Sequence, residues 1–182
     1  MLTRTFFVCL FVGLYSAGSS LSCRWMDHKF RQYSENSLAL VETMVSNSTN
    51  STEGEVQDTV AFPNDLYSQV SKASAEDKVV FTVQALDEMA ALFEEDYSSA
   101  SFEEKTVKDF LSVVTQQADG LRSCIESHSH EKNKKLHMYF KRLSSHVLKG
   151  MRHSAKSWEL IRKEIKTHLM RADQLVSSLL TN

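Results

Sequence analysis

Apolar residues recur three and four positions apart along five stretches of this 182-residue chain. This spacing matches one face of an α-helix, because about 3.6 residues complete a helical turn. We therefore expect five amphipathic helices whose apolar faces share one core. The predicted helices cover residues 25–45, 74–97, 101–124, 136–150 and 154–180.

Residues at three of the predicted helix ends indicate how those ends are capped. Ser74 precedes an acidic first turn that includes Asp77, which gives the second helix a hydroxyl N-cap. Ser101 and Glu104 have the spacing of a capping box at the start of the third helix. Gly150 stands where a left-handed cap would end the fourth helix.

A long connection separates the first two predicted helices. Residues 46–74 lose the helical spacing, begin with the polar run SNSTNSTEGE and contain the only proline of the chain, Pro63. Such a loop can run the length of a bundle, so that the helices it joins point the same way. The sequence thus predicts an all-α fold, a five-helix up-up-down-down bundle with a long first crossover loop.

The N-terminus has the composition of a secretory signal peptide. Arg4 precedes the apolar run FFVCLFVGLY, which at about ten residues is too short to cross a bilayer. Ser20 and Ser22 then give the small-x-small pattern of a cleavage site. We expect a signal peptide at 1–22 and a secreted helical domain at 23–182, without membrane insertion.

Cleavage at this site would leave two cysteines, Cys23 and Cys124, because Cys9 departs with the signal peptide. An even number of cysteines in an oxidising pathway favours pairing, and these two form the only intramolecular pair. Closing a loop of about 100 residues restricts the unfolded chain by roughly 4–5 kcal/mol in the chain-entropy account. Two unpaired thiols are the alternative.

Two adjacent sequons lie in the long connection, at Asn47-Ser-Thr and Asn50-Ser-Thr. In a secreted chain these sequences accept N-linked glycans. We expect at least one glycan, and adjacency makes the two sites compete. The alternative is that neither asparagine is used.

The small net charge of −2 hides an asymmetry along the chain. Residues 23–120 contain 7 Lys and Arg against 18 Asp and Glu, whereas residues 121–182 contain 13 against 5. Either the acidic and basic parts attract each other within the bundle, or the basic part forms a partner-binding face. Nucleic acid is not an expected partner, because the chain has no nucleic-acid-binding motif and KNKK at 132–135 is interpreted as exposed helix surface.

The motifs that enzymatic or metal chemistry requires are absent from the sequence. There is no HExxH, no Gly-rich phosphate loop and no GxSxG, and no Glu has a His three residues later. His128 and His130 alternate in a short polar segment, where either zinc binding or plain solvation would explain them. We expect no catalysis, no metal and no cofactor.

Several segments together resemble a type I interferon, specifically the two-cysteine group of fish type I interferons. The most specific is SAKSWELIRKEI at 154–165, because a Trp-Glu-apolar-apolar-Arg-x-Glu-Ile run on the final helix recurs in interferons. The others are Cys23, AFPNDLY at 61–67, SSASFEEKTVKDFL leading to Cys124, and YFKRLSSHVLK at 139–149.

The resemblance implies a five-helix cytokine, secreted and antiviral, that pairs two different class II cytokine receptor chains. Pairing would start JAK-STAT signalling and the expression of interferon-stimulated genes. In the family, the final helix, the long loop and part of the first helix bind one receptor chain, and the second, third and fourth helices face the other. Arg162 matches the family's receptor-contacting arginine, with Lys163 and Lys166 nearby on the side expected to be exposed.

The chain departs from the family pattern in two places. The second disulfide of the family, between the long loop and the last helix, is missing, because residues 46–75 and 150–158 contain no cysteine. We therefore expect a freer loop. The position one turn beyond Arg162, where mammalian members carry another arginine, is Thr167.

Two other functions fit a secreted helical chain. An interleukin-10-like cytokine would be an intertwined dimer, whereas we expect a monomer. A carrier of lipids or small molecules would need an apolar cavity, whereas the large apolar residues of the predicted helices are sufficient to fill a core.

Overall fold

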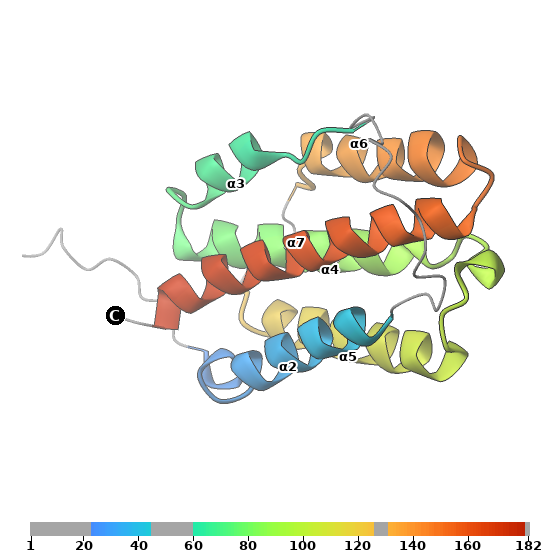
Figure 1. Cartoon of the computed structure of the whole chain (residues 1–182). Helices are drawn as coiled ribbons and strands as arrows, with labels where there is room; N and C mark the ends of the chain where they lie inside the picture. Colours follow the sequence, from blue (N-terminus) through green and yellow to red (C-terminus); the bar gives the residue numbers. More distant parts are fainter. Residues whose placement is uncertain (1–22, 45–59, 126–130, 181–182) are drawn as a thin grey trace, which may run out of the picture.

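The structure, a computed structural model, describes residues 23–44, 60–125 and 131–180, and every regular element in those ranges is helical (Figure 1). This confirms the all-α prediction. The longer helices are α2 (Arg24–Thr43), α4 (Ala75–Leu92), α5 (Glu104–Arg122), α6 (Lys134–Arg142) and α7 (Ala155–Leu180). The shorter ones are α3 (Asn64–Val70), the 3-10 turn η1 (Ser98–Ala100) and the π-helix η2 (Leu143–Lys149).

Some predicted features fall outside the described residues. They are the signal peptide at 1–22, the sequons at Asn47 and Asn50, and the alternating His128 and His130. Among the helices that the structure does describe, none combines the length and apolarity that crossing a membrane would take.

Four helices form the up-up-down-down bundle. The colour gradient in Figure 1 shows α2 and α4 running one way and α5 and α7 running the other. Both α2 and α4 pack against α5 and α7. The fifth long segment is α6 continued by η2, which packs against α4 and α7. The long crossover is therefore required to bring the chain back from the end of α2 to the start of α4.

The core is organised around α7, whose buried positions have the predicted helical spacing. Near its start, Trp158 is fully buried, donates from Nε1 to the Asp96 carbonyl at 3.0 Å, and stacks on Phe93 with ring centroids 5.4 Å apart. The other buried apolar residues of α7 are Ile161, Ile165, Leu169, Ala172, Leu175 and Val176. Each Ile, Leu or Val side chain among them contributes about 1.5–3 kcal/mol when it leaves water.

A disulfide joins Cys23 to Cys124, the two cysteines that the sequence analysis pairs, with their Cα atoms 5.3 Å apart. It fastens the residue before α2 to a residue just beyond α5, and these two helices pack along their lengths. The covalent link therefore reinforces a helix contact that also has its own apolar interface.

Of the three predicted caps, only the first is confirmed. The Asp77 amide donates to the Ser74 hydroxyl at 3.1 Å. The capping box at Ser101 and Glu104 is wrong, because α5 begins at Glu104 itself and Ser101 has a φ of 56° in a turn before the helix. The intervening Phe102 packs edge-on against Trp158, which delays the helix start.

The predicted left-handed cap at Gly150 is also wrong. Its φ is −60°, because α6 passes into the π-helix η2 and the Gly150 amide donates to the Ser145 carbonyl at 3.1 Å. Left-handed conformations occur two residues later, at Arg152 and His153. Glycine is favoured at 150 because an added Cβ would lie 2.2 Å from the His146 carbonyl oxygen.

Part of the predicted long loop is helical and firmly docked. The structure places α3 at Asn64–Val70, and a cluster of aromatic rings holds this segment against α6 and α7. At the centre is the fully buried His168, whose Nδ1 lies 2.7 Å from the Tyr67 hydroxyl and whose ring centroid lies 4.7 Å from that of Phe62. Tyr139 and Phe140 of α6 also contact the His168 ring. Residues 60–70 are therefore docked on the bundle without a second disulfide.

The contact between α2 and α5 includes a close approach at a glycine. The indole of Trp25 lies over Gly120 of α5, where an added Cβ would be 2.0 Å from Trp25 Cε2. We expect Gly120→Ala to lower the free energy of unfolding by about 1–3 kcal/mol, because overpacking displaces the indole or the helix. Urea unfolding monitored by circular dichroism measures this change.

The matched control for Gly120→Ala is the same substitution in a Trp25→Ala background. Without the indole, alanine should stabilise α5 by roughly 0.5–1 kcal/mol, because it restricts the unfolded chain more than glycine does. A loss of stability of the same size in both backgrounds would contradict the proposed contact.

Burial of His168 predicts that acid destabilises the fold. Burial lowers the pKa of His168 from its ordinary 6.5 to about 3, because the protonated imidazole would lose its contact with water there. The contribution of the neutral His168 ring to stability is therefore complete above pH 6.5 and is lost as the pH falls towards 3. We expect the free energy of unfolding to drop by about 2 kcal/mol between pH 7 and pH 5.

His168→Gln is the control for this pH effect, because glutamine can form a hydrogen bond with the Tyr67 hydroxyl but does not titrate. Its free energy of unfolding should change little between pH 7 and pH 5. The pKa values of Glu42 and Glu95 are already lowered below 4.5 by hydrogen bonds from Lys166 and Lys149 respectively, so these carboxylates titrate below the window. An equal pH slope in wild type and variant would contradict the assignment.

Candidate functional site

The outward side of α7 presents a continuous row of side chains along the bundle. Because the opposite face is buried, positions three and four residues apart on this side face solvent. We call the row the α7 outer stripe; its members are Lys156, Leu160, Lys163, Thr167, Met170 and Gln174. All of them are exposed except Leu160, which is half-buried.

Arg162, which we expected to be exposed, is mostly buried, with 13% of its side chain accessible. Its Nε and Nη2 donate to the two carboxylate oxygens of Glu159 at 2.8 and 2.6 Å. Its Nη1 donates to the Val41 carbonyl at 3.2 Å. Val41 is in the last turn of α2, where carbonyls lack partners within the helix. Arg162 therefore caps α2 from α7, and the Glu159 hydrogen bond raises its pKa despite its burial.

The two lysines have different environments. Lys166 is half-exposed, at 40%, and its Nζ lies 2.8 Å from a carboxylate oxygen of Glu42 on α2. Hydrogen bonding from Lys166 holds the pKa of Glu42 below its usual value. Lys163 is exposed and forms no ion pair with any residue in the described ranges. Of the three basic residues, Lys163 is the one available to a partner without breaking an existing pair.

Met170 is a candidate contact that the sequence analysis missed. It is one of two large hydrophobic side chains that are exposed in the described part of the chain, with 48% of its surface accessible. It lies seven residues, or two turns, beyond Lys163, and therefore on the same side of α7. That spacing was visible in the sequence, but only the fold shows that position 170 faces solvent.

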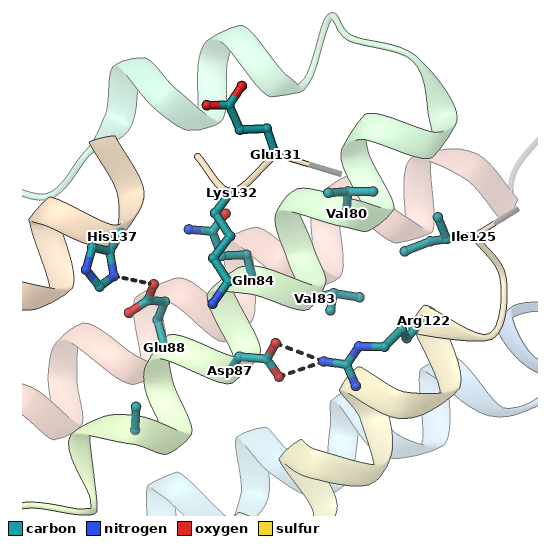
Figure 2. Close-up of a pocket in the computed structure, with 11 residues that line it drawn as sticks. Val80, Val83, Gln84, Asp87, Glu88, Arg122, Ile125, Glu131, Lys132 and His137 are labelled. Carbon is teal, nitrogen blue, oxygen red and sulfur yellow. Dashed lines mark hydrogen bonds and ion pairs between the residues drawn. The ribbon is translucent and has the colours of Figure 1, made fainter. Parts of the chain in front are cut away.

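A second surface is a groove of about 550 Å³ between α4, the end of α5 and the start of α6 (Figure 2). Val80 and Val83 contribute apolar surface to it. Arg122 of α5 donates from Nη2 to both carboxylate oxygens of Asp87 on α4, at 3.0 and 2.8 Å. Figure 2 shows this pair reaching across between the two helices.

The other end of the groove is held by two interactions between α4 and the start of α6. His137 Nδ1 lies 2.9 Å from a Glu88 carboxylate oxygen. The Gln84 amide donates to the Asn133 carbonyl at 3.0 Å and accepts from the Asn133 amide at 2.7 Å. These contacts fix the spacing of the three helices that line the groove.

No group of three or more potential metal ligands occurs in the part of the chain that the structure describes. Lys166–Glu42 and Arg122–Asp87 are ion pairs between helices, whereas Arg162 pairs with Glu159 on its own helix.

Comparisons with known proteins agree on one family. A family model for the interferon alpha/beta domain matches residues 26–179. Interferon a3 of the trout Oncorhynchus mykiss is 34% identical over 180 residues, which are 98% of this chain and 99% of the trout protein. Among solved structures, zebrafish interferon 1 matches with a TM-score of 0.72 and 28% identity, over 86% of this chain and 99% of that one.

These matches extend over the bundle, both surfaces and the disulfide-bonded segment from Cys23 to Cys124. They favour a cytokine over the alternative of a carrier, and an interferon over the interleukin-10-like alternative. The chain belongs to the interferon alpha/beta family and is a type I interferon cytokine of the fish type, which is not an enzyme.

Proposed function

We propose that the protein is a secreted antiviral cytokine that pairs two different class II cytokine receptor chains and thereby starts JAK-STAT signalling. The observation that carries the proposal is the presence of two separately braced surfaces that share no helix. One is the α7 outer stripe, and the other is the groove between α4, α5 and α6. A ligand that joins two receptors needs two such surfaces on one rigid body.

Secretion is part of the proposal. The disulfide between Cys23 and Cys124 supports it, because disulfides persist in oxidising compartments. The apolar run after Arg4 supplies the signal, and Cys23 would follow the cleavage site. We also propose a glycan on Asn47 or Asn50, which would lie in the connection after α2.

The α7 outer stripe combines the groups that bind partners most strongly. Met170 offers an adaptable apolar contact, and methionine is enriched at protein interfaces. Lys163 offers a cation without an existing partner in the described ranges. We propose that Met170 provides buried area and that Lys163 pairs with a receptor carboxylate, with Lys166 available at the edge. Arg162 acts through position, because it fixes α7 against the end of α2.

The groove between α4, α5 and α6 is proposed as the surface for the second receptor chain. Its apolar patch is surrounded by the Asp87–Arg122 and Glu88–His137 pairs. Because Asp87 and Arg122 neutralise each other and the Glu88 carboxylate is within hydrogen-bond distance of the His137 ring, a partner would meet a mixed polar rim around an apolar centre, the common pattern of interfaces.

The direct test of this function is a cell response. We expect purified protein to induce antiviral transcripts and to lower virus yield in fish cells that carry the cognate receptors. Cells from which either receptor chain has been deleted should show no induction, which separates pairing from binding of a single chain. Full induction after either deletion would contradict the proposal.

Binding at the α7 outer stripe predicts the effect of two substitutions there. We expect Lys163→Glu combined with Met170→Ala to weaken binding to one receptor chain at least about tenfold, or about 1.4 kcal/mol, and to leave the other unchanged. The reasons are a reversed charge and a lost apolar contact. Surface plasmon resonance with each purified receptor ectodomain measures both affinities.

The chain offers a matched control on α6, where Lys141 and Met138 are also exposed. Lys141→Glu with Met138→Ala makes the same chemical changes away from α7 and should leave the first receptor affinity unchanged. Equal weakening by both variants would remove the α7 outer stripe as the specific site.

Arg162→Ala tests whether Arg162 stabilises the packing of α7 on α2 rather than contacting the receptor. Because it leaves the Val41 carbonyl and the Glu159 carboxylate without this partner, we expect a loss of stability of about 1 kcal/mol or more. The Lys163 and Met170 substitutions should leave the unfolding midpoint unchanged, which distinguishes the two effects.

A further inference from the structure

A row of basic side chains on α6 and η2 takes no part in either proposed receptor surface. Residues 132–152 contain seven Lys and Arg and no Asp or Glu. Within this segment, five basic residues fall on one side of α6 and its continuation η2. We call this row the α6 basic stripe; its members are Lys134, Lys135, Lys141, Arg142 and Lys149.

The α6 basic stripe is exposed and lies along a hollow. A groove of about 770 Å³ runs between α6 and the α3 segment, and Lys134, Lys135 and Arg142 line its α6 wall. Met138, 43% exposed, lies between them at helical spacing. The α3 wall contributes the amides of Asn64 and Gln69 and one carboxylate, Asp65. Figure 1 shows α3 and α6 together on one edge of the bundle.

Most of this positive charge is not neutralised within the described part of the chain. Lys135, Lys141 and Arg142 form no ion pair with any described residue. Lys134 pairs with Glu131 at 3.0 Å, but both side chains are more than four-fifths exposed, so the pair is weak. Lys149 pairs with Glu95 at 2.9 Å.

The position of two of these lysines is unfavourable for the helix itself. Lys134 and Lys135 occupy the first turn of α6, immediately after the N-cap Asn133. The N-terminal end of a helix carries partial positive charge, so cations there are repelled. Two lysines in this turn therefore do not serve the stability of the helix, and a bound polyanion would reverse the penalty.

We propose that the α6 basic stripe binds a sulfated polysaccharide of the extracellular matrix. The stripe extends for about 20 Å, as 1.5 Å per residue gives for this segment. A linear chain with closely spaced sulfates can contact such a row of cations along its length. The amides of Asn64 and Gln69 can bond to sugar hydroxyls on the other wall. This inference rests on the proposed secretion, and it goes beyond receptor pairing.

The exposed groups favour a polysaccharide over two other polyanions. Single-stranded nucleic acid binds where bases stack on aromatic rings, and the two aromatic residues of α6, Tyr139 and Phe140, are buried. Insertion into an anionic membrane requires a broad apolar face, and Met138 is the one exposed large hydrophobic residue described on α6.

Salt-dependent binding to heparin tests the proposal. We expect the full chain without its signal peptide to elute from immobilised heparin at higher NaCl than from a sulfonate cation exchanger. Substituting glutamine for Lys134, Lys135, Lys141 and Arg142 should lower that elution point. By titration calorimetry, the slope of log affinity against log salt should fall by roughly one for each cation removed.

The matched control carries the same loss of four charges elsewhere. Glutamine at Arg24, Lys29, Arg31 and Lys72, which are exposed on α2 and after α3, should leave heparin elution nearly unchanged. An equal shift in both variants would overturn the proposal, because net charge alone would then explain binding. Tighter wild-type binding to single-stranded DNA or to phosphatidylserine vesicles than to heparin would overturn the choice of polysaccharide.

Receptor signalling gives a readout that separates this inference from the proposed function. The α6 glutamine variant should induce antiviral transcripts normally in cells that lack sulfated polysaccharides. Heparin binding without any transcript induction by wild type would defeat the proposed function and leave the inference standing. If wild type induces transcripts and the α6 glutamine variant binds heparin as tightly as wild type, the polysaccharide inference fails and the proposed function stands.

Discussion

The burial of one face of α7 constrains most of what this molecule can present to partners. Trp158, Ile161 and Ile165 begin a buried row that continues to Val176, and α2 and α4 cover it. Rotating α7 by one residue, about 100°, would expose Trp158 and bury charged groups, at a cost of several kcal/mol. The identity of the α7 outer stripe is thus fixed by the core and not by the stripe itself.

The orientation of α7 in the core also determines which of its side chains contact α2. Arg162 lies beside the buried row, where its long side chain can reach the last turn of α2 while its carbon stem remains covered. Lys166, one turn further along α7, pairs with Glu42 of α2. Two consecutive turns of α7 are therefore tied to the end of α2, and the orientation of any partner bound to α7 is coupled to that helix.

Periodicity was sufficient to predict the long helices, because each buries a stripe that is visible as a three- and four-residue spacing. It could not predict α3, which is seven residues long and stabilised chiefly by the docking of Tyr67 and Phe62 on His168. Arg162 was expected to be exposed and is instead mostly buried. Its partners, Glu159 and the Val41 carbonyl, come from packing that a single sequence does not show. The same limit applies to Gly150, where the π-helix displaced the turn.

The charge asymmetry of the sequence supported two interpretations, and the structure assigns different residues to each. Lys149, Lys166 and Arg122 of the basic part pair with Glu95, Glu42 and Asp87 of the acidic part. These pairs join separate segments of the bundle and represent mutual complementarity. The basic residues without such pairs in the described ranges gather on the outer sides of α6 and α7, where partners can reach them.

The His168 cluster ties the long connection to the last helix without a covalent bond. The family's second disulfide would tie the long connection to the last helix, and here Phe62 and Tyr67 of that connection pack on His168 of α7. Fully burying one large aromatic side chain contributes about 1.5–3 kcal/mol, and Tyr67 is buried whereas Phe62 is half-buried, so this tie is of the same order as the roughly 2–4 kcal/mol typical of a disulfide. The noncovalent tie differs in one respect. It depends on a neutral imidazole, so its strength is linked to pH, whereas the bond between Cys23 and Cys124 is not. This interferon therefore combines one covalent constraint at the start of α2 with one titratable constraint at the middle of α7.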